Sequence, residues 1–136
     1  MKIVPIEEIN VGNSAEITKR MSLEMVTAFA GISEDFNPVH LDSEYASKSR
    51  YKAQIIHGLM ASSLFSGLFG TQLPGEGCVY KSQNIRFKRP IYVGDEVTAK
   101  IEVVNVDVNK KVISFTTRCF VNGKVMIDGE SEIFVP

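Results

Sequence analysis

Apolar and polar positions follow two different patterns on either side of Gly75. From Ala53 to Gly75 no residue carries a charge, and apolar residues recur at the spacing of a helix. We therefore predict a helix from about Gly58 to Thr71, ended by Pro74-Gly75. Because no face of this helix is charged, it must be enclosed on nearly all sides.

Beyond Gly75 the apolar residues return at every second position, as they do in half-buried strands. We predict an antiparallel meander whose strands cover Cys78 to Phe87, Val97 to Val103, Ile113 to Val121 and Lys124 to Val135. The inward-facing positions are expected to be Val97, Ala99, Ile101 and Val103 on one strand, and Ile113, Phe115, Thr117, Cys119 and Val121 on the next.

Turn residues separate these strands. Asn109-Lys110 is expected to form a turn, and Asn122-Gly123 predicts a tight hairpin. Gly129 interrupts the last strand and indicates a bulge.

Shorter elements are predicted before the uncharged helix. An extended piece covers Ala15 to Lys19, and Ser22 is a good N-cap for a helix that Gly31 would stop. Irregular chain is expected from Ile32 to His40, since Pro38 disfavours helical geometry at the residue before it.

A second cap follows directly. Asp42 can cap a short helix over Ser43 to Ala46, after which Lys48 to Lys52 forms a solvated loop.

The two patterns together predict an α+β fold. One antiparallel sheet, curled by its normal twist, can wrap around a single helix such as Gly58–Thr71. A chain of 136 residues is long enough for one substantial core, so we expect a single domain over residues 1–136.

Composition narrows the function classes. The formal net charge of -1 predicts no general attraction to nucleic acid or to anionic membranes. Polar residues inside Ala53–Gly75 favour a buried helix over a membrane span. Cys78 and Cys119 lack the spacing of a metal site or disulfide framework, which favours free thiols in the cytoplasm. Acidic residues at Glu7 and Glu8 interrupt the start, so no export signal is expected.

The candidate chemistry lies around the two histidines of the chain. Asp35 and His40 flank a turn fixed by Pro38, and His57 opens the uncharged helical run. A carboxylate and an imidazole near one another are the usual groups of an acid–base catalyst.

Four stretches resemble the MaoC-like (R)-specific enoyl-CoA hydratases. Phe29 to His40, with its Asp-x-Asn-Pro-x-His core, is similar to their hydratase motif. Ile56 to Met60 and Leu64 to Gly67 are similar to their central helix, and Arg86 to Asp95 to the strand and turn beyond. The resemblance covers essentially the whole chain. It implies a hot dog fold, usually dimeric, with the motif on a segment that overhangs the helix. It also implies reversible hydration of a short trans-2-enoyl-CoA to the (R)-3-hydroxyacyl-CoA, often for polyhydroxyalkanoate synthesis.

The resemblance assigns the central roles. It makes Asp35 and His40 the acid–base pair and the backbone N–H of Gly58 the donor to the thioester oxygen. A free N–H at a helix start suits a growing negative charge, although a glycine there also permits close packing. His57 is expected to be structural, because its side chain need not point where the Gly58 amide points.

Neighbouring residues receive supporting roles. Asn37 and Pro38 are expected to shape the loop. Gly58, Ser62, Ser66 and Phe69 fall on one helical stripe. Ser66 could orient Asp35 or bond back to its own helix, and Phe69 could close an acyl pocket or simply fill the core.

Substrate phosphates need positive charge. Arg86, Lys88 and Arg89, with Lys48, Arg50 and Lys52, are candidates to meet coenzyme A, although each could equally be a solvated surface residue. No metal and no cofactor beyond the coenzyme A of the substrate is expected.

Three alternatives remain at this point. A hydroxyacyl-carrier-protein dehydratase or a hot dog thioesterase commonly places an acidic residue on the central helix, and Ala53–Gly75 has none. The third alternative is an acyl-CoA binding module without catalysis, against which the intact Asp35/His40 pair argues.

Overall fold

The computed structural model describes residues 2–136 and places one antiparallel sheet against one long helix. In chain order the elements are η1 (Ile6–Glu8), β1 (Ser14–Arg20), α1 (Leu23–Ser33), α2 (Pro38–Leu41), α3 (Ser43–Ser47), α4 (Gly58–Thr71), β2 (Val79–Phe87), β3 (Glu96–Asp107), β4 (Val112–Val121) and β5 (Lys124–Phe134). The predicted α+β class and the predicted bounds of the long helix are confirmed.

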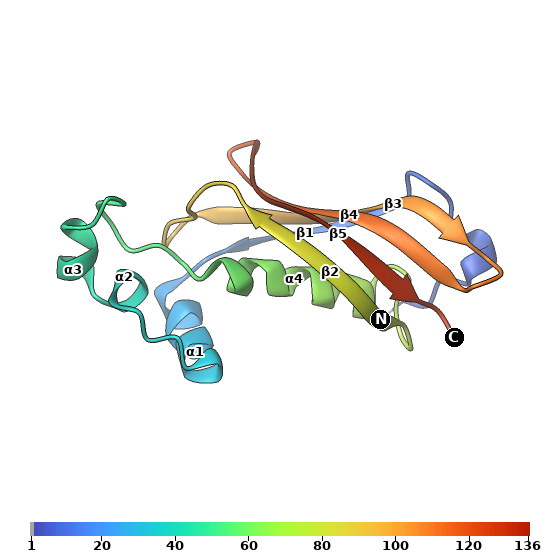
Figure 1. The fold of residues 1–136 in the computed structure, drawn as a ribbon, viewed down its shortest axis with the longest axis horizontal. Coiled ribbons are helices and arrows are strands. Elements are labelled where there is room, and N and C mark those ends of the chain that lie inside the picture. Colours follow the sequence, from blue (N-terminus) through green and yellow to red (C-terminus); the bar gives the residue numbers. More distant parts are fainter. Residues whose placement is uncertain (1) are drawn as a thin grey trace.

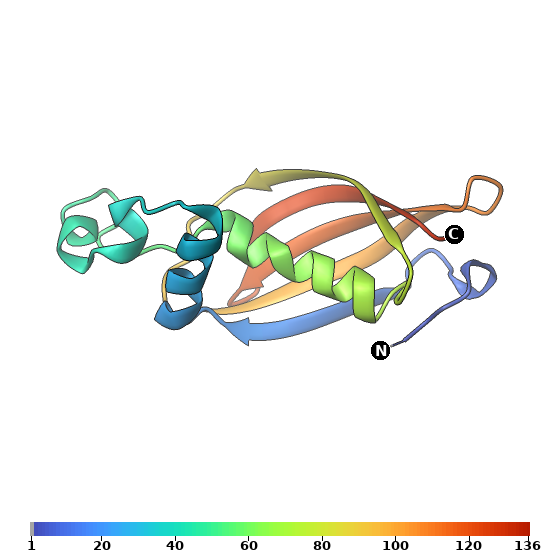
Figure 2. The ribbon, with the colours of Figure 1, turned by 90° about the horizontal axis from the view of Figure 1, so that it is seen from below.

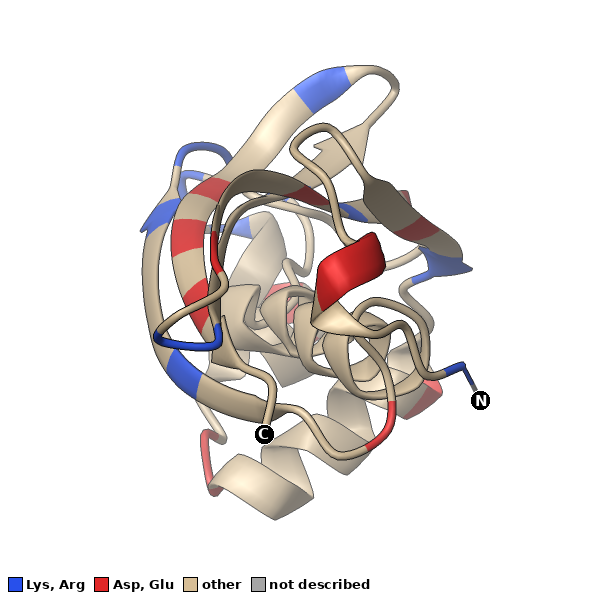
Figure 3. Ribbon diagram, turned by 90° about the vertical axis from the view of Figure 1, so that its right-hand side faces the viewer, with Lys and Arg blue, Asp and Glu red and all other residues tan. Residues whose placement is uncertain are grey.

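The sheet curves around α4, as the views from two sides show (Figures 1 and 2). Its five strands lie in the order β1-β3-β4-β5-β2, with every neighbouring pair antiparallel. Seen along the longest axis of the molecule, charged residues lie on the strands, the loops and the short helix η1 around the uncharged helix (Figure 3). None of the helices among residues 2–136 has the length and apolar character needed to cross a membrane.

The core explains why α4 carries no charge. Met60, Ala61, Phe65, Leu68 and Phe69 of α4 are buried beneath the sheet. The predicted inward positions of β3 and β4, from Val97 to Val121 in alternation, are also buried. Two apolar surfaces that fit each other in this way remove one another from water, which is the main stabilising term of the fold.

The sheet topology differs from the predicted meander in one strand. β3, β4 and β5 do follow one another as hairpins, and Asn122 and Gly123 both have the positive φ that their turn requires. However, β2 pairs with β5 at the far edge and not with β3, its successor in the chain. Short-range periodicity identifies a strand but contains no information on its partner.

The predicted bulge at Gly129 was also wrong. Gly129 pairs regularly with Ile85 and Thr117, and the register shift of β5 lies at Met126, between Cys119 and Phe120 of β4. Gly129 is needed for close approach instead, because a Cβ there would lie 2.0 Å from the main-chain oxygen of Asn84.

Helices α1, α2 and α3 form a segment, Leu23 to Ser47, that extends beyond the N-terminal end of α4 (Figures 1 and 2). We call this segment the overhang. Ser22 caps α1 by accepting a hydrogen bond from the Met25 N–H, and Asp42 caps α3, both as predicted. Gly31 does not stop α1, which continues to Ser33 and ends at Glu34 in the left-handed conformation.

The chain predicted to be irregular contains a further short helix. Pro38 occupies the first turn of α2, where its missing N–H costs nothing, and the Asn37 side chain caps the helix by accepting from Val39 N–H. Pro38 was expected to shape the loop and to disfavour helical geometry before it, whereas it also begins a helix.

Candidate active site

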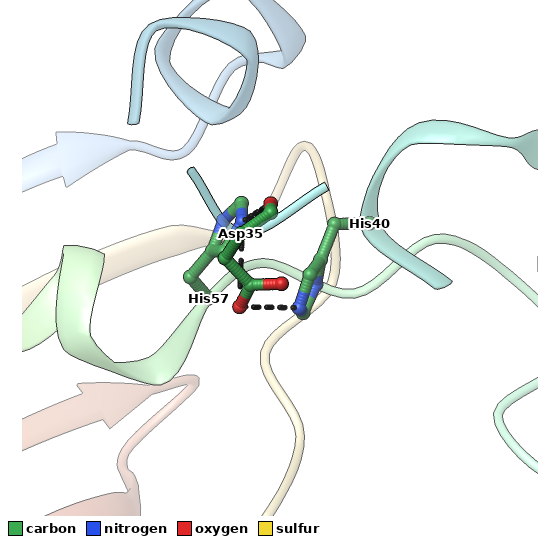
Figure 4. A group of neighbouring side chains, drawn as sticks. All are labelled: Asp35, His40 and His57. Carbon is green, nitrogen blue, oxygen red and sulfur yellow. Dashed lines mark hydrogen bonds and ion pairs between the residues drawn. The ribbon is translucent and has the colours of Figure 1, made fainter. Parts of the chain in front are cut away.

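The overhang brings Asp35 and His40 together near the N-terminal end of α4 (Figure 4). Asp35 Oδ2 lies 3.8 Å from His40 Nε2, and the Asp35 side chain is 48% exposed whereas that of His40 is 10% exposed. The two predicted residues therefore lie close together, with the Asp35 carboxylate open to solvent and the His40 ring buried in the protein.

Local hydrogen bonds fix the Asp35 carboxylate. Its Oδ1 accepts from the Asn37 backbone N–H at 3.1 Å, and the Asp35 N–H donates to Ser33 Oγ at 3.1 Å. The first bond is the turn that Asp forms with the chain two residues on. Because Oδ1 is used in this bond, Oδ2 is the oxygen that faces His40.

One hydrogen bond also fixes the tautomer of a neutral His40. Nδ1 lies 2.7 Å from the carbonyl oxygen of Ile55, which can only accept, so Nδ1 carries the proton. Nε2 is then an acceptor, and it faces a second acceptor, Asp35 Oδ2. A water molecule has two protons to donate and can reach both atoms at hydrogen-bond distances of about 2.8 Å. The gap is thus suited to bind and deprotonate a water.

His57 lies in the same cluster, where the sequence analysis expected a purely structural residue. Its ring stacks on that of His40 with centroids 3.9 Å apart, and its Nε2 lies 3.0 Å from the Asp35 carbonyl oxygen. The sequence did place His57 directly before Gly58, one helical turn before the buried residues of α4, and this position could have indicated that it lies near the site. Its position in the sequence alone did not show that the His57 side chain points toward Asp35.

Gly58 is the first residue of α4, so its N–H lies among those that have no acceptor within the helix. The positive end of the helix dipole is at the same place. A Cβ on Gly58 would lie 2.5 Å from two ring carbons of Phe87, so the Phe87 ring packs directly on this glycine. A glycine at this position therefore permits close packing with Phe87 and places its N–H at the positive end of α4.

Two cavities meet at these residues. One of about 390 Å³ includes Asp35, His40 and His57 in its wall, together with the apolar side chains of Phe29 and Leu59. The other, of about 350 Å³, includes Arg50, Lys88 and Arg89. His40, Gly58 and Phe87 line both cavities, so the Asp35/His40 pair lies where a cavity with apolar walls at Phe29 and Leu59 adjoins a basic one.

The remaining residues of the helical stripe are not brought to Asp35 within this chain. Ser62 is buried and donates back to the Gly58 carbonyl oxygen at 3.0 Å. Ser66 is exposed, and no hydrogen bond joins it to Asp35 in the part of the chain that the structure describes. Phe69 is buried at the far end of α4 against Tyr80 and Phe115 and lines neither of the two cavities around His40.

The predicted basic residues divide into two groups. Lys88 and Arg89 line the basic cavity, as does Arg50 from the loop after α3. Arg86 does not line it, and its Nη2 lies 3.5 Å from an Asp128 carboxylate oxygen, a carboxylate that Lys88 and Arg118 also approach. Lys88 lies 4.0 Å from the same carboxylate, and Arg89 donates a hydrogen bond to the Val125 carbonyl oxygen. These contacts hold both side chains in the wall of the cavity.

Asp35, His40 and His57 also bring metal-ligand atoms within 4.8 Å of one another. Their geometry does not suit a metal ion, because the two rings are stacked and His57 Nε2 already bonds the Asp35 carbonyl oxygen. Ligands of one ion need lone pairs that converge on it.

Comparison with known proteins decides the family. The MaoC like domain matches residues 7–124. The chain belongs to the MaoC-like domain family. It is 44% identical over 131 residues to the (R)-specific enoyl-CoA hydratase of Aeromonas caviae, covering 96% of this chain and 98% of that one. A hydratase of the same name from Rhodospirillum rubrum is 41% identical, covering 96% of this chain and 90% of its relative.

A solved structure confirms the hot dog fold. The (R)-hydratase from A. caviae involved in PHA biosynthesis superposes with a TM-score of 0.93 at 44% identity, over 96% of this chain and 99% of that one. The agreement extends over the overhang as well as the sheet and α4, so this MaoC-like chain has the whole architecture and not only its core.

Proposed function

We propose that this MaoC-like protein is an (R)-specific enoyl-CoA hydratase that adds water reversibly to short trans-2-enoyl-CoA thioesters. The observation that carries the proposal is the 3.8 Å gap between two acceptors, His40 Nε2 and Asp35 Oδ2, next to the N-terminus of α4. The near full-length similarity to hydratases of this name supports the substrate and the product handedness.

The reaction follows from the geometry. A water in the gap loses a proton to the Asp35/His40 pair while its oxygen bonds to the β-carbon of the enoyl group. Negative charge then develops on the thioester oxygen, where the Gly58 N–H and the α4 dipole stabilise it. A proton returned from the pair to the α-carbon completes the addition of one water. In the reverse direction the same groups eliminate it.

The two cavities suggest how the substrate lies. The basic cavity with Arg50, Lys88 and Arg89 suits the phosphates of coenzyme A, and the apolar cavity with Phe29 and Leu59 suits a short acyl chain. The thioester would then cross between them beside His40 and Gly58. Phe69 remains a candidate to close the acyl pocket and Ser66 a candidate to orient Asp35, in a site to which a second subunit would add further walls.

We further propose a homodimer in the cytoplasm with no cofactor besides the coenzyme A of the substrate. β2 is an edge strand with exposed apolar side chains, Val79, Tyr80 and Phe87, so pairing with the same edge of a second copy would cover them. The free thiols of Cys78 and Cys119 favour a reducing compartment. A supply of monomers for polyhydroxyalkanoate synthesis is the role suggested by the A. caviae relative.

Hydration of crotonyl-CoA tests the proposal. We expect rapid loss of the enoyl-thioester absorbance, and oxidation of the product by an (R)-specific but not by an (S)-specific 3-hydroxyacyl-CoA dehydrogenase. The same acyl group on an acyl carrier protein serves as the comparison. Turnover on the carrier protein alone would make the protein a dehydratase of carrier-bound chains, and no turnover on either would make it a binding module.

A further inference from the structure

His57 connects three parts of the site that come from different elements. Its side chain is 3% exposed, its Nε2 lies 3.0 Å from the carbonyl oxygen of Asp35, and one face of its ring covers His40. The ring also packs on Phe29, at a centroid distance of 4.9 Å and a tilt of 56°. His57 is also the residue directly before Gly58, at the N-cap of α4.

The hydrogen bond determines which nitrogen of His57 carries the proton. A carbonyl oxygen can only accept, so Nε2 is the donor and Nδ1 of the neutral ring is an acceptor. Nδ1 is buried and has no hydrogen-bond partner among the described residues. A buried polar atom without a partner is costly. This cost indicates that the hydrogen bond and the ring contacts of His57 stabilise its orientation by more than a hydrogen bond to Nδ1 would.

We propose that His57 is a positioning residue for the hydration, an inference that rests on the proposed function. Its Nε2–H holds the main chain at Asp35, and its ring holds the plane of His40, so that Oδ2 and Nε2 stay 3.8 Å apart around one water. His57 itself transfers no proton in this scheme. Because catalysis depends on near-attack geometry, a small shift of either group lowers the turnover number.

Three substitutions separate the hydrogen bond from simple packing. His57→Phe keeps an aromatic ring against His40 but removes the donor. His57→Gln can place an N–H close to the position of His Nε2, whereas the shorter His57→Asn reaches only the position of Nδ1. The Asn variant is therefore the matched control for the Gln variant, with the same chemistry at the wrong distance.

Kinetics on crotonyl-CoA provide the first test. We expect the Phe and Asn variants to lose at least tenfold in kcat with KM within about threefold of the unsubstituted protein, and the Gln variant to stay within about fivefold in kcat. A Phe variant with kcat within threefold of the unsubstituted protein would show that packing suffices. A Gln variant no better than the Asn variant would reject the donor role. Circular dichroism and thermal unfolding establish that each variant is folded.

Nitrogen NMR of the histidine rings gives a second test that needs neither turnover nor any variant to fold. The unsubstituted protein is expected to show the Nε2–H tautomer at His57 and the Nδ1–H tautomer at His40. The opposite tautomer at His57 would overturn the proposal. If crotonyl-CoA is not hydrated, the proposed function fails, whereas these tautomers still decide whether His57 donates to Asp35.

Discussion

The scaffold of α4 and the five strands differs from the overhang in what holds it together. In the scaffold, side chains such as Phe65, Ile101 and Phe115 are fully buried and pack across distant parts of the chain. In the overhang, short helices begin at side-chain caps such as Asn37 and Asp42. The fold thus separates stability from chemistry, since Asp35 and His40 both lie on the segment with few buried residues.

The two regions meet through a small number of polar contacts at the site. His40 Nδ1 donates to Ile55, just before α4, and His57 Nε2 donates back to Asp35. In the proposed mechanism the overhang supplies the acid–base groups, α4 supplies the helix N-terminus, and the segment just before α4 supplies the bonds that position them. We therefore expect substitutions of buried scaffold residues to lower the free energy of unfolding, and substitutions of Asp35 or His40 to lower turnover.

The largest expected effect is the loss of a core ring. Phe65→Ala empties the space between α4 and the sheet and should lower the free energy of unfolding by about 3–5 kcal/mol. Urea unfolding followed by circular dichroism measures it. Ile32→Ala, at an 81% exposed aliphatic residue of α1, is the control and should change stability by less than about 0.5 kcal/mol. Equal effects of the two substitutions would contradict the division.

The acid–base pair should show the opposite behaviour. Asp35→Asn keeps an oxygen for the Asn37 N–H but removes the carboxylate charge, so kcat should fall about a hundredfold or more while the melting temperature stays unchanged. His40→Gln should reduce kcat by at least as much. Steady-state hydration of crotonyl-CoA and thermal unfolding of the same samples provide the data. A fully active Asp35→Asn protein would remove this carboxylate from the mechanism.

The same division explains what the sequence could predict. The bounds of α4, the inward residues of β3 and β4 and the hairpin at Asn122-Gly123 follow from periodicity and turn chemistry, which are local properties. The partner of β2 is not local, because pairing with β5 is chosen by the closure of the sheet around α4. The motif specifies residue types, and so it identified Asp35 and His40 as candidates. It does not specify backbone conformation, and so it did not predict α2.

The orientation of side chains was the least predictable property. His57 was expected to be structural and Ser66 was a candidate to orient Asp35, yet His57 contacts Asp35 and Ser66 is exposed. A helical stripe fixes the direction of each residue relative to the helix axis, but the overhang reaches only the first turn of α4. Which residue meets Asp35 therefore depends on where the overhang crosses the helix, a tertiary feature without a local signal.

Alkaline pH should weaken the scaffold through the Cys119 thiol and the Tyr80 hydroxyl. Burial raises the pKa of the Cys119 thiol and the pKa of the Tyr80 hydroxyl each to about 12. A raised pKa in the folded state means that stability is complete below the unfolded value, 9.0 for Cys119, and is lost as pH rises toward 12. The thiol alone should cost roughly 2–3 kcal/mol at pH 11.

Urea midpoints between pH 8 and 11 measure this loss, and Cys119→Ala provides the comparison. The alanine variant should be less stable at pH 8, because it leaves a small cavity, but its stability should fall less steeply above pH 9. Parallel slopes for the two proteins would show that Cys119 does not titrate in this range on unfolding.

The smallest expected effect tests whether a cap in the overhang serves the site as well as its own helix. Asn37→Ala removes the acceptor of the Val39 N–H but keeps the backbone N–H that binds Asp35, so we expect about 1 kcal/mol less stability. Because α2 carries His40, kcat should also fall several-fold, and Asn37→Ser, which restores a cap, should recover most of it. Asp42→Ala removes the equivalent cap of α3 and should cost similar stability with no change in kcat. If the Asn37 and Asp42 variants lower kcat equally, the overhang acts as one flexible unit, and the placement of His40 does not depend on its own helix cap.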